Sequence, residues 1–395
     1  MRTGNPTVLR TLNERAALEL LLRHGSLTRA ELETHTGLSK ASAAEVLRRL
    51  EKGRLARKGG HRPGPAGPAA QVWVLEGTAA RVAGVDLTAR SVEIAVADLT
   101  GAVVGPYRAQ APDEGRDAAE FLAGALGAAA RDAGVDLDDL DQIVVGVPGV
   151  VDPGGERLRQ AVQLSGWSHL DDLTGLRERL GPERVRLEND VNLVTIQELA
   201  LREQSTFVLF WLGGGVGAGA VLDGRLWRGA TGRGGEIGSV VVPDPVGRGR
   251  VYGPGGGPLG ALLGAGPLAD LAAAHGLTTE PTLAAVAETL CGAAAHPDFL
   301  ADVAARVALG VIAAVGVLDP GLVVLGGPLC AAAGEPLRAL VAEHLAATSL
   351  APVPVACGAG DGNAVLDGAV RHALDLARER VFQAGTAGRT GETTP

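Results

Sequence analysis

The stretch "STFVLFWLGGGVGAGAVLDGRLWRGATGRGGEIG" (Ser205–Gly238) decides the fold of this 395-residue chain. Apolar strands flank a run of glycines, Gly213-Gly214-Gly215-Val216-Gly217. Turns of this kind bind phosphates, because backbone amides approach an anion closely only where no Cβ intervenes. A lone carboxylate, Glu236, follows at the end of the stretch. The pattern predicts a β-hairpin that contributes to a small-molecule site.

The order of strands and helices around this stretch occurs twice. An earlier set reads "RVAGVDLT", "SVEIAVADL" and "AVVGPYRA", then a helix over 118–133, the strands "QIVVGVPG" and "RVRLEND", and a helix from Val191. The later set reads "STFVLFWLGGG", "GAGAVLDG" and "SVVV", then helices, the strand "LVVLGGP" and more helices. The repetition predicts two similar α/β lobes with a ligand cleft between them.

Charge divides the chain unevenly. Residues 1–64 hold 13 Lys and Arg against 6 Asp and Glu, whereas the remainder holds 23 against 39. A basic head on an acidic body indicates that only the head meets nucleic acid. The alternative is an ordinary solvated surface.

The head has the pattern of a winged helix-turn-helix. Thr28 and Glu31 form a capping box for a second helix, Gly37 marks the turn, and Ser39 caps a third helix. A strand, a Gly/Pro-rich turn and another strand then predict a wing. The expected apolar positions are Leu9, Leu12, Ala16 and Leu20 on the first helix, and Ala30, Leu32, Leu38, Val46, Leu47 and Leu50 in the core between the helices.

The start of the third helix is where recognition helices meet base edges, and the basic residues beyond it suit phosphates. The alternative is a three-helix interaction module with incidental charge. The predicted DNA-binding residues are Thr28, Arg29, Ser39, Lys40, Ala41, Ser42, Arg48, Arg49, Arg57, Lys58 and Arg62.

The ordered motifs "GVPGVVDP", "LSGW", "LENDVN", "GGGVGAG…GRGGEIG" and "LVVLGGP" resemble the ROK family of repressors and sugar kinases. The resemblance covers the whole body and implies an actin-like, ribonuclease H-like ATPase fold. The head places the chain with the family's transcriptional regulators. The expected domains are a winged helix-turn-helix over 1–77, a first lobe over 78–190, a second lobe over 191–383 with a C-terminal helix that either stays there or returns to the first lobe, and a disordered tail over 384–395.

The resemblance also locates a nucleotide site. Family kinases carry Asp-x-Gly-Gly-Thr at the first hairpin, whereas this chain reads "DLTAR", with Thr88-Ala89-Arg90 in place of Gly-Gly-Thr. Added Cβ atoms and a cation at a tight turn argue against Mg-ATP, so neither ATP nor magnesium is expected. The remnant of the phosphate site consists of Asp86, Gly213, Gly214, Gly215, Gly217, Gly326 and Gly327.

Asn189-Asp190 matches the family's pair in which the Asp is the catalytic base. Asp190 is therefore the expected catalytic residue if kinase activity persists. The pair also suits a sugar clamp without chemistry, or a plain helix cap before "VNLVTIQELA".

The family's zinc site is missing from the sequence. The family reads Gly-Glu-x-Gly-His, then a Cys cluster and a Glu; here Glu236 is kept, Ser239 stands at the His, no Cys occurs over 240–260, and Gly260 stands at the last Glu. No zinc and no other metal is expected. Arg248, Arg250 and Tyr252 either bind an acidic ligand or belong to a solvated loop. Trp167 either stacks on a sugar or closes the core. The predicted ligand-binding residues are Gly149, Trp167, Asn189, Asp190, Glu236 and Ser239.

Three functions remain open at this point. The first is a DNA-binding regulator, expected to be a repressor, whose degenerate kinase fold senses a sugar or sugar phosphate as a homodimer or homotetramer on double-stranded operator DNA. The second is an ATP-dependent sugar kinase with an accessory head, and the third is a regulator whose body serves only for oligomerisation. Isolated cysteines, no signal-peptide pattern and a longest apolar run of about 12 residues predict a cytoplasmic protein without a membrane partner.

Overall fold

The computed structural model describes residues 6–64, 67–112, 117–154, 157–160, 164, 167, 174–242, 259–348, 352–359 and 362–387. The chain forms two compact units: unit 1 comprises 1–145, 165–186 and 369–395, and unit 2 comprises 146–164 and 187–368. The lobe boundary predicted from the sequence was 190/191, so segment 146–164 was assigned to the first lobe rather than to the second. The last helix, α12 (Ala364–Ala387), runs from unit 2 into unit 1. It stays helical to residue 387, so the tail predicted from 384 begins too early; residues 388–395 lie outside the described part.

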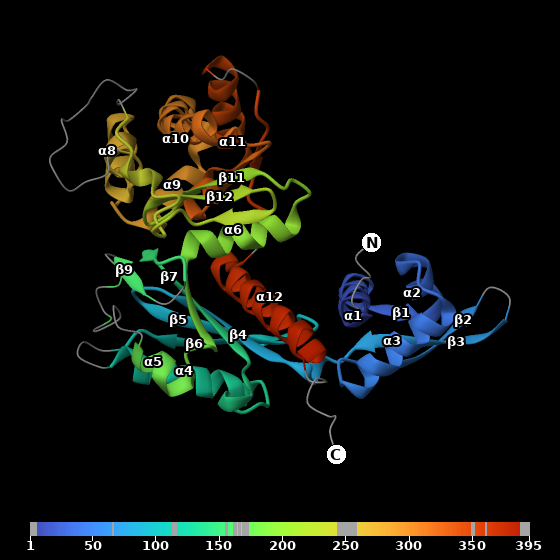
Figure 1. The fold of residues 1–395 in the computed structure, drawn as a ribbon. Coiled ribbons are helices and arrows are strands. Elements are labelled where there is room, and N and C mark those ends of the chain that lie inside the picture. Colours follow the sequence, from blue (N-terminus) through green and yellow to red (C-terminus); the bar gives the residue numbers. More distant parts are fainter. Residues whose placement is uncertain are drawn as a thin grey trace. The chain divides into compact units, whose positions relative to one another are not determined.

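A five-stranded sheet forms the body of unit 1 (Figure 1). Its order is β10-β7-β4-β5-β6, with an antiparallel meander over β4, β5 and β6. Helices α4 (Ala118–Asp132) and α5 (Thr174–Leu180) pack against each other beside it. The strands are β4 (Arg81–Leu87), β5 (Ser91–Asp98), β6 (Val103–Gln110), β7 (Gln142–Val147) and β10 (Val185–Asn189).

The sheet of unit 2 repeats this topology. Its order is β13-β12-β11-β14-β15, so in both sheets the third, second, first, fourth and fifth strands lie side by side. The two similar α/β lobes predicted from the sequence are thus confirmed. One strand was predicted wrongly: Ser239 ends a 3₁₀ turn and residues 240–242 are irregular, so the third place in the sheet belongs to β13. The strands are β11 (Phe207–Leu212), β12 (Val216–Leu222), β13 (Arg225–Trp227), β14 (Val323–Gly326) and β15 (Val355–Cys357).

Helices surround the sheet of unit 2, and the core lies between them. The helices are α6 (Asp190–Leu201), α7 (Gly260–Leu263), α8 (Ala265–Ala274), α9 (Leu283–Cys291), α10 (Pro297–Leu318) and α11 (Pro328–Thr348). Unit 2 also contains a separate two-stranded ribbon of β8 (Val150–Val151) and β9 (Leu158–Gln160). Among the described residues, α10 alone is long and apolar enough to cross a bilayer by length and composition; the uninterrupted apolar run of about 12 residues lies within it, after Arg306. Its Val303, Val307 and Val311 are buried in the core, and Arg306 donates to the carbonyl of Leu262 (2.9 Å). α10 therefore packs as a core helix.

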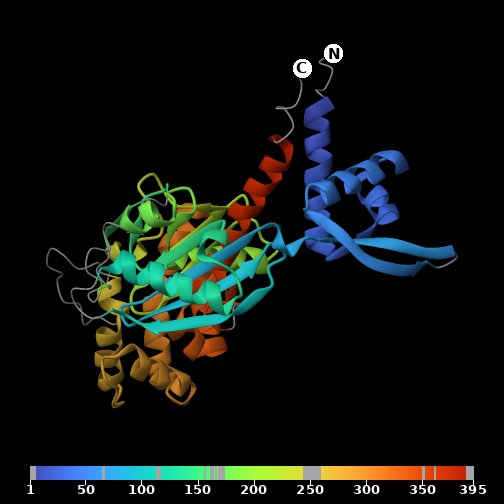
Figure 2. The same ribbon diagram turned by 90° about the horizontal axis from the view of Figure 1, so that it is seen from below.

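The head has the element order of a winged helix-turn-helix: α1 (Pro6–His24), β1 (Ser26–Thr28), α2 (Arg29–Thr36), α3 (Lys40–Lys52), β2 (Ala56–Gly64) and β3 (Gly67–Leu75). β1, β3 and β2 form one sheet, and β2 and β3 project from the helices as a long wing (Figure 2). The predicted capping box is present, because Thr28 and Glu31 exchange side-chain to backbone bonds. Gly37 ends α2 in the left-handed region (φ +70°), as the tight turn requires.

The core of the head is smaller than predicted. Leu32, Val46, Leu47 and Leu50 are buried, whereas Ala30 is exposed and Leu38 is half-buried. Leu9 and Leu12 are 55% and 54% exposed, so the N-terminal half of α1 does not bury the face that its helical spacing suggested. The buried part of α1 starts further along, at Ala17, Leu18 and Leu21, which pack toward the other two helices.

Candidate functional site

The start of α3, where the sequence predicted base contacts, is exposed. Ser39 caps the helix by accepting from the amide of Ser42 (3.2 Å). Lys40, Ala41 and Ser42 are all exposed, as their predicted role requires. Small side chains beside one lysine leave room for close approach to base edges.

Several of the predicted phosphate-binding cations are held by carboxylates of the head itself. Arg49 pairs with Glu14 (2.6 Å) with only 13% of its side chain exposed, so it joins α3 to α1 and is unsuited to DNA contact. Thr28 is also buried, with its hydroxyl in the capping box. Both are corrections to the predicted DNA-binding set.

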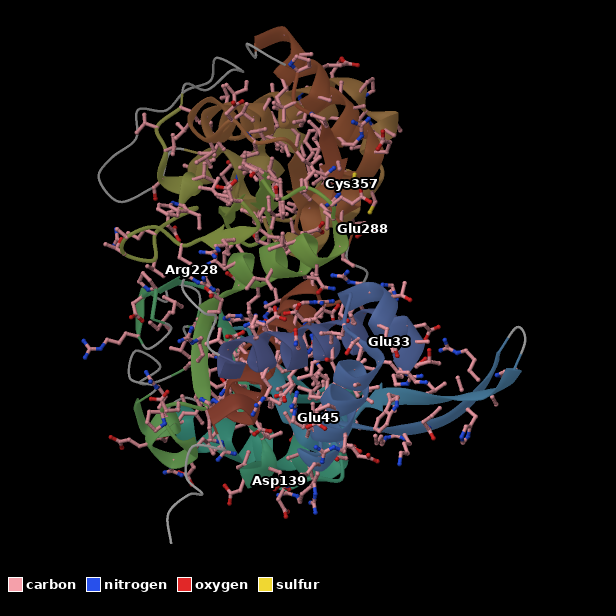
Figure 3. The ribbon with its side chains drawn as sticks, turned by 45° about the vertical axis from the view of Figure 1, so that its right-hand side comes forward. Glu33, Glu45, Asp139, Arg228, Glu288 and Cys357 are labelled. Atoms are coloured by element: carbon pink, nitrogen blue, oxygen red, sulfur yellow. The ribbon has the colours of Figure 1, made fainter. Side chains whose placement is uncertain are left out.

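The remaining paired cations keep exposed side chains, except Arg29, which is partly exposed. Arg62 of the wing donates to Glu31 (2.7 Å) and to the Ser26 hydroxyl (2.8 Å). The other pairs are Arg29 with Glu33, Arg48 with Glu45, Arg57 with Glu76 and Lys58 with Glu51; Glu33 and Glu45 are labelled in Figure 3. Surface pairs of this kind contribute little stability.

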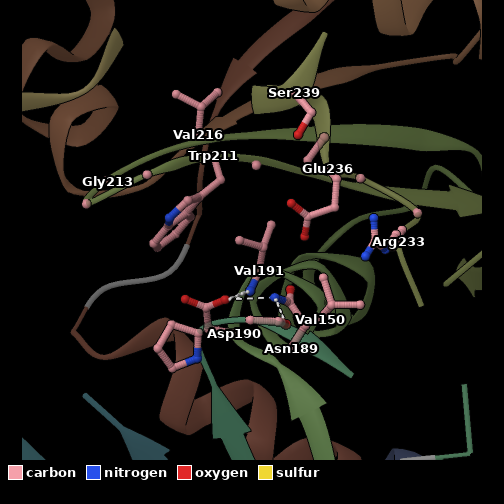
Figure 4. A pocket seen from close by; sticks show the side chains of 18 of the residues that line it. Val150, Asn189, Asp190, Val191, Trp211, Gly213, Val216, Arg233, Glu236 and Ser239 are labelled. Atoms are coloured by element: carbon pink, nitrogen blue, oxygen red, sulfur yellow. Dashed lines mark hydrogen bonds between the residues drawn. The ribbon is translucent and has the colours of Figure 1, made fainter. Parts of the chain in front are cut away.

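Unit 2 contains a cavity of about 400 Å³, within the size range of small-molecule sites (Figure 4). The cavity brings together predicted residues from four segments of the chain. Predicted residues in its lining are Gly149, Asn189, Asp190, Gly213, Gly214, Gly215, Gly217, Glu236 and Ser239. Trp167, Asp86, Gly326 and Gly327 do not line it.

Asn189 and Asp190 lie where β10 meets α6, at one wall of the cavity. The Asn189 amide donates to the carbonyl of Gly149 (2.9 Å) and to Asp190 Oδ1 (3.1 Å), and its Oδ1 accepts from the backbone amide of Asn192 (3.0 Å). Asp190 Oδ1 also accepts from the amide of Val191 (2.9 Å). The pair therefore caps α6 and presents a carboxylate to the cavity, so the cap and the clamp are compatible roles.

A buried ion pair behind this wall was missed by sequence reasoning. Glu188 is 3% exposed; its Oε1 accepts from the amide of Asn189 (3.0 Å) and from the Asn192 side chain (2.8 Å). Its Oε2 accepts from Arg228 Nε (2.7 Å) and Nη2 (2.6 Å). An acidic residue directly before Asn189-Asp190 was the available signal, but nothing in the sequence pointed to Arg228 as its partner.

Glu236 and Ser239 face the cavity from the other side, around the short 3₁₀ turn Ile237–Ser239 (Figure 4). Loss of hydration raises the pKa of the Glu236 carboxyl above its usual value, and the Arg233 guanidinium opposes this shift. The residue is more than a third exposed overall, so the shift reflects the enclosed position of the carboxyl group rather than full burial. Two carboxylates, an amide and a hydroxyl around one cavity suit a polyhydroxylated ligand.

Trp167 and the first hairpin turn belong to unit 1. Trp167 is 6% exposed, lies edge-on to Phe121 (5.6 Å between ring centroids) and donates its indole N–H to the carbonyl of Thr88 (2.8 Å). Of the two roles predicted for Trp167, the structure shows the one in the core.

The turn between β4 and β5 is closed on itself. The hydroxyl of Thr88 accepts from the amides of Arg90 (3.3 Å) and Ser91 (3.0 Å) and donates to the Ser91 carbonyl (3.1 Å). The amides of Arg90 and Ser91 are thus already occupied at this turn. Asp86 lies near the end of β4, two residues before Thr88, and is 9% exposed.

No group of three or more His, Cys, Asp or Glu side chains suited to a metal occurs among the described residues. Arg248, Arg250 and Tyr252 lie outside the described part, and Gly260 begins α7. Cys330 is buried, which raises its thiol pKa to about 12 and makes a thiolate ligand unfavourable there.

Comparison with known proteins places this architecture. A model described as the ROK family matches residues 82–375. The chain is 26% identical over 254 residues to the N-acetylglucosamine repressor of Escherichia coli O6:H1, covering 62% of this chain and 60% of that protein. It is 22% identical over 246 residues to the xylose repressor of Bacillus subtilis, covering 61% and 63%. The chain thus spans about 60% of the length of these curated relatives.

Two solved structures share the fold. A ROK family transcriptional regulator described as a homolog of the E. coli MLC protein matches with a TM-score of 0.74 and 17% identity, covering 96% of this chain and 99% of that chain. A ROK hexokinase from Thermus thermophilus matches with a TM-score of 0.60 and 26% identity, covering 74% and 97%. The fold is therefore the two-lobed architecture of ROK regulators and sugar kinases, and the curated relatives named above are repressors.

Proposed function

This chain belongs to the ROK family, and on that premise we propose that it is a DNA-binding transcriptional regulator, a repressor, whose body senses a small ligand. The observation that carries the proposal is the winged head joined to a complete ROK body. The hexokinase match accounts for nearly all of the kinase but leaves about a quarter of this chain uncovered, whereas the regulator match extends over 96% of it. Similarity to repressors of sugar metabolism supports the same function.

The ligand proposed for the pocket is a sugar or a sugar derivative. Asn189, Asp190 and Glu236 offer the carboxylates and amide that hold hydroxyl groups, and the cavity is large enough for one ring with substituents. A ligand that binds one conformation of the body more tightly than another shifts the population of states, and so the affinity for operator DNA.

The proposed partners are double-stranded DNA and a second copy of the chain, as a homodimer or homotetramer. Two-fold symmetry would place half-sites one or two helical turns apart. Chromosomal operator DNA would place the protein in the cytoplasm. We propose no zinc and no nucleotide as resident cofactors, because Ser239 replaces an imidazole ligand and the first hairpin turn is occupied by its own side chain.

A second candidate is an ATP-dependent sugar kinase with an accessory head. Asp190 at the start of α6, facing a glycine loop, favours it. A coupled assay for ADP release with a panel of sugars, on the wild type and Asp190→Ala, tests it directly. Turnover that Asp190→Ala abolishes would establish the kinase; a body used only for oligomerisation would show neither turnover nor ligand response.

The DNA-binding face is tested by fluorescence anisotropy on DNA from upstream of the chain's own gene. Lys40→Ala should weaken binding on all sequences and reduce the salt slope by about one. Ser42→Ala, on the same exposed turn, removes a neutral side chain and should leave the salt slope unchanged whatever it does to affinity. Unchanged binding and unchanged salt slope in Lys40→Ala would place the DNA contact elsewhere.

A further inference from the structure

Trp211 lines the pocket although no sequence pattern pointed to it. It lies near the end of β11, on the same face as Phe207 and Leu209, because side chains alternate along a strand. Its cross-strand partners are Gly217 on β12 and Gly326 on β14. Because both partners lack a side chain, the indole has room on the sheet surface between them.

The indole occupies the space between two glycine turns. A Cβ added at Gly213 would lie 2.9 Å from the indole Nε1, and one added at Gly326 would lie 3.5 Å from its Cε3. The ring therefore extends from one turn to the other. Figure 4 shows it pointing from β11 into the cavity on the side of Asp190.

One amide of the loop, and one just beyond it, already have backbone acceptors. Gly213 donates its amide to the carbonyl of Gly215 (3.0 Å), and Ala218 donates its amide to the carbonyl of Gly235 (2.8 Å). A phosphate needs backbone donors at about 3 Å and a free path to them. At Gly213 the backbone donor is already used, and the indole of Trp211 occupies the space beside it.

We propose that Trp211 determines what this pocket accepts: its indole excludes nucleotide phosphates from the turns at Gly213–Gly217 and Gly326–Gly327. The glycines of these turns then serve as space for a ring rather than as a phosphate cradle. The ligand that remains is a hydroxylated ring held by Asn189, Asp190 and Glu236, with the indole as its apolar wall. This rests on the proposed function, since it concerns the effector pocket of a regulator.

The test is isothermal titration of the full chain with the ATP analogue AMP-PNP and Mg²⁺. The wild type should show no binding at nucleotide concentrations up to the millimolar range. Trp211→Ala should bind with a Kd at least about tenfold below that limit. Trp211→Leu keeps an apolar side chain against the cluster that includes Val191, in case the smaller residue destabilises unit 2. Trp227→Ala, an exposed tryptophan on β13 outside the pocket lining, is the matched control and should behave as the wild type.

Each outcome decides the proposal. Binding gained by the Trp211 variants and not by Trp227→Ala supports it. Nucleotide binding by the wild type as tight as that of the variants overturns it, and so does absence of binding in folded Trp211→Ala and Trp211→Leu. Fluorescence anisotropy on operator DNA with the same proteins separates the two proposals. Absence of specific DNA binding by the wild type would contradict the proposed regulator function and would leave the nucleotide result unaffected.

Discussion

The first hairpin turn, Thr88–Ser91, and the glycine loop, Gly213–Gly217, occupy equivalent places in the two repeated sheets, between the first and second strands. In the first, the Thr88 hydroxyl accepts from the amides of Arg90 and Ser91. In the second, the glycines are kept, and an indole from the preceding strand covers them. Under the proposal that neither turn binds a phosphate, the two regions illustrate two routes to that result: changing the glycines, or keeping them and filling the space they create.

The largest effect should come from the glycine pair beside the second loop. Gly327 has φ +92°, and an added Cβ would lie 2.3 Å from the carbonyl oxygen of Leu212. Gly327→Ala should therefore lower the free energy of unfolding of unit 2 by about 2–4 kcal/mol, because alanine disfavours this positive φ and its Cβ would clash with a backbone atom. Thermal and urea unfolding measure it.

Gly316→Ala is the control for this change. Gly316 lies inside α10 with open space around its Cβ position, so alanine there should be neutral or stabilise by up to about 1 kcal/mol. Equal stability of the two variants would mean that the backbone at Gly327 can relax, and that the glycine is not required for packing.

A smaller effect is expected in the first turn. Thr88→Ala removes the hydroxyl that accepts from Arg90 and Ser91, at a cost of about 1 kcal/mol and with faster hydrogen exchange at both amides. Thr88→Ser keeps the hydroxyl and should keep the protection. Exchange as slow in Thr88→Ala as in Thr88→Ser would show that the turn is not held by this side chain, and the contrast between the two loops would fail.

Features that depend on residues close together in the chain could be predicted from the sequence, and contacts between distant residues could not. The capping box at Thr28 and Glu31, the repeated strand order and the loss of Gly-Gly-Thr at Thr88–Arg90 depend on neighbours in the chain, and the sequence contains them. The pairing of Arg49 with Glu14, which removes a predicted DNA contact, depends on how two helices cross.

The same limit explains the errors at the pocket. Trp211 reads as an ordinary core residue of an apolar strand until the register shows a glycine on each side. The partnership of Glu188 with Arg228 joins residues 40 positions apart, and Trp167 finds its acceptor 79 positions away at Thr88. No periodicity encodes such contacts, so the sequence left their roles open.

The smallest predicted effect concerns the pH dependence of the pocket. Because the pKa of Glu236 is raised in the folded chain, ionisation costs stability above that pKa and costs nothing below the ordinary value of 4.5. Glu236→Gln should therefore match the wild type near about pH 4 and become slightly more stable toward neutral pH, by about 0.5 kcal/mol or less after solvent screening. Thermal unfolding across that range checks it, and a gain that is present at acidic pH and lost at neutral pH would contradict the sign.

The most direct test of the central account is fluorescence anisotropy of the purified chain on DNA from upstream of its own gene, at two salt concentrations, with and without a panel of sugars and sugar phosphates. We expect sequence-specific binding that one member of the panel weakens, and loss of that response in Asp190→Ala with DNA affinity retained. Binding that is blind to sequence and merely falls with salt, or a ligand response unchanged in Asp190→Ala, would contradict a sensor-regulator built on this pocket.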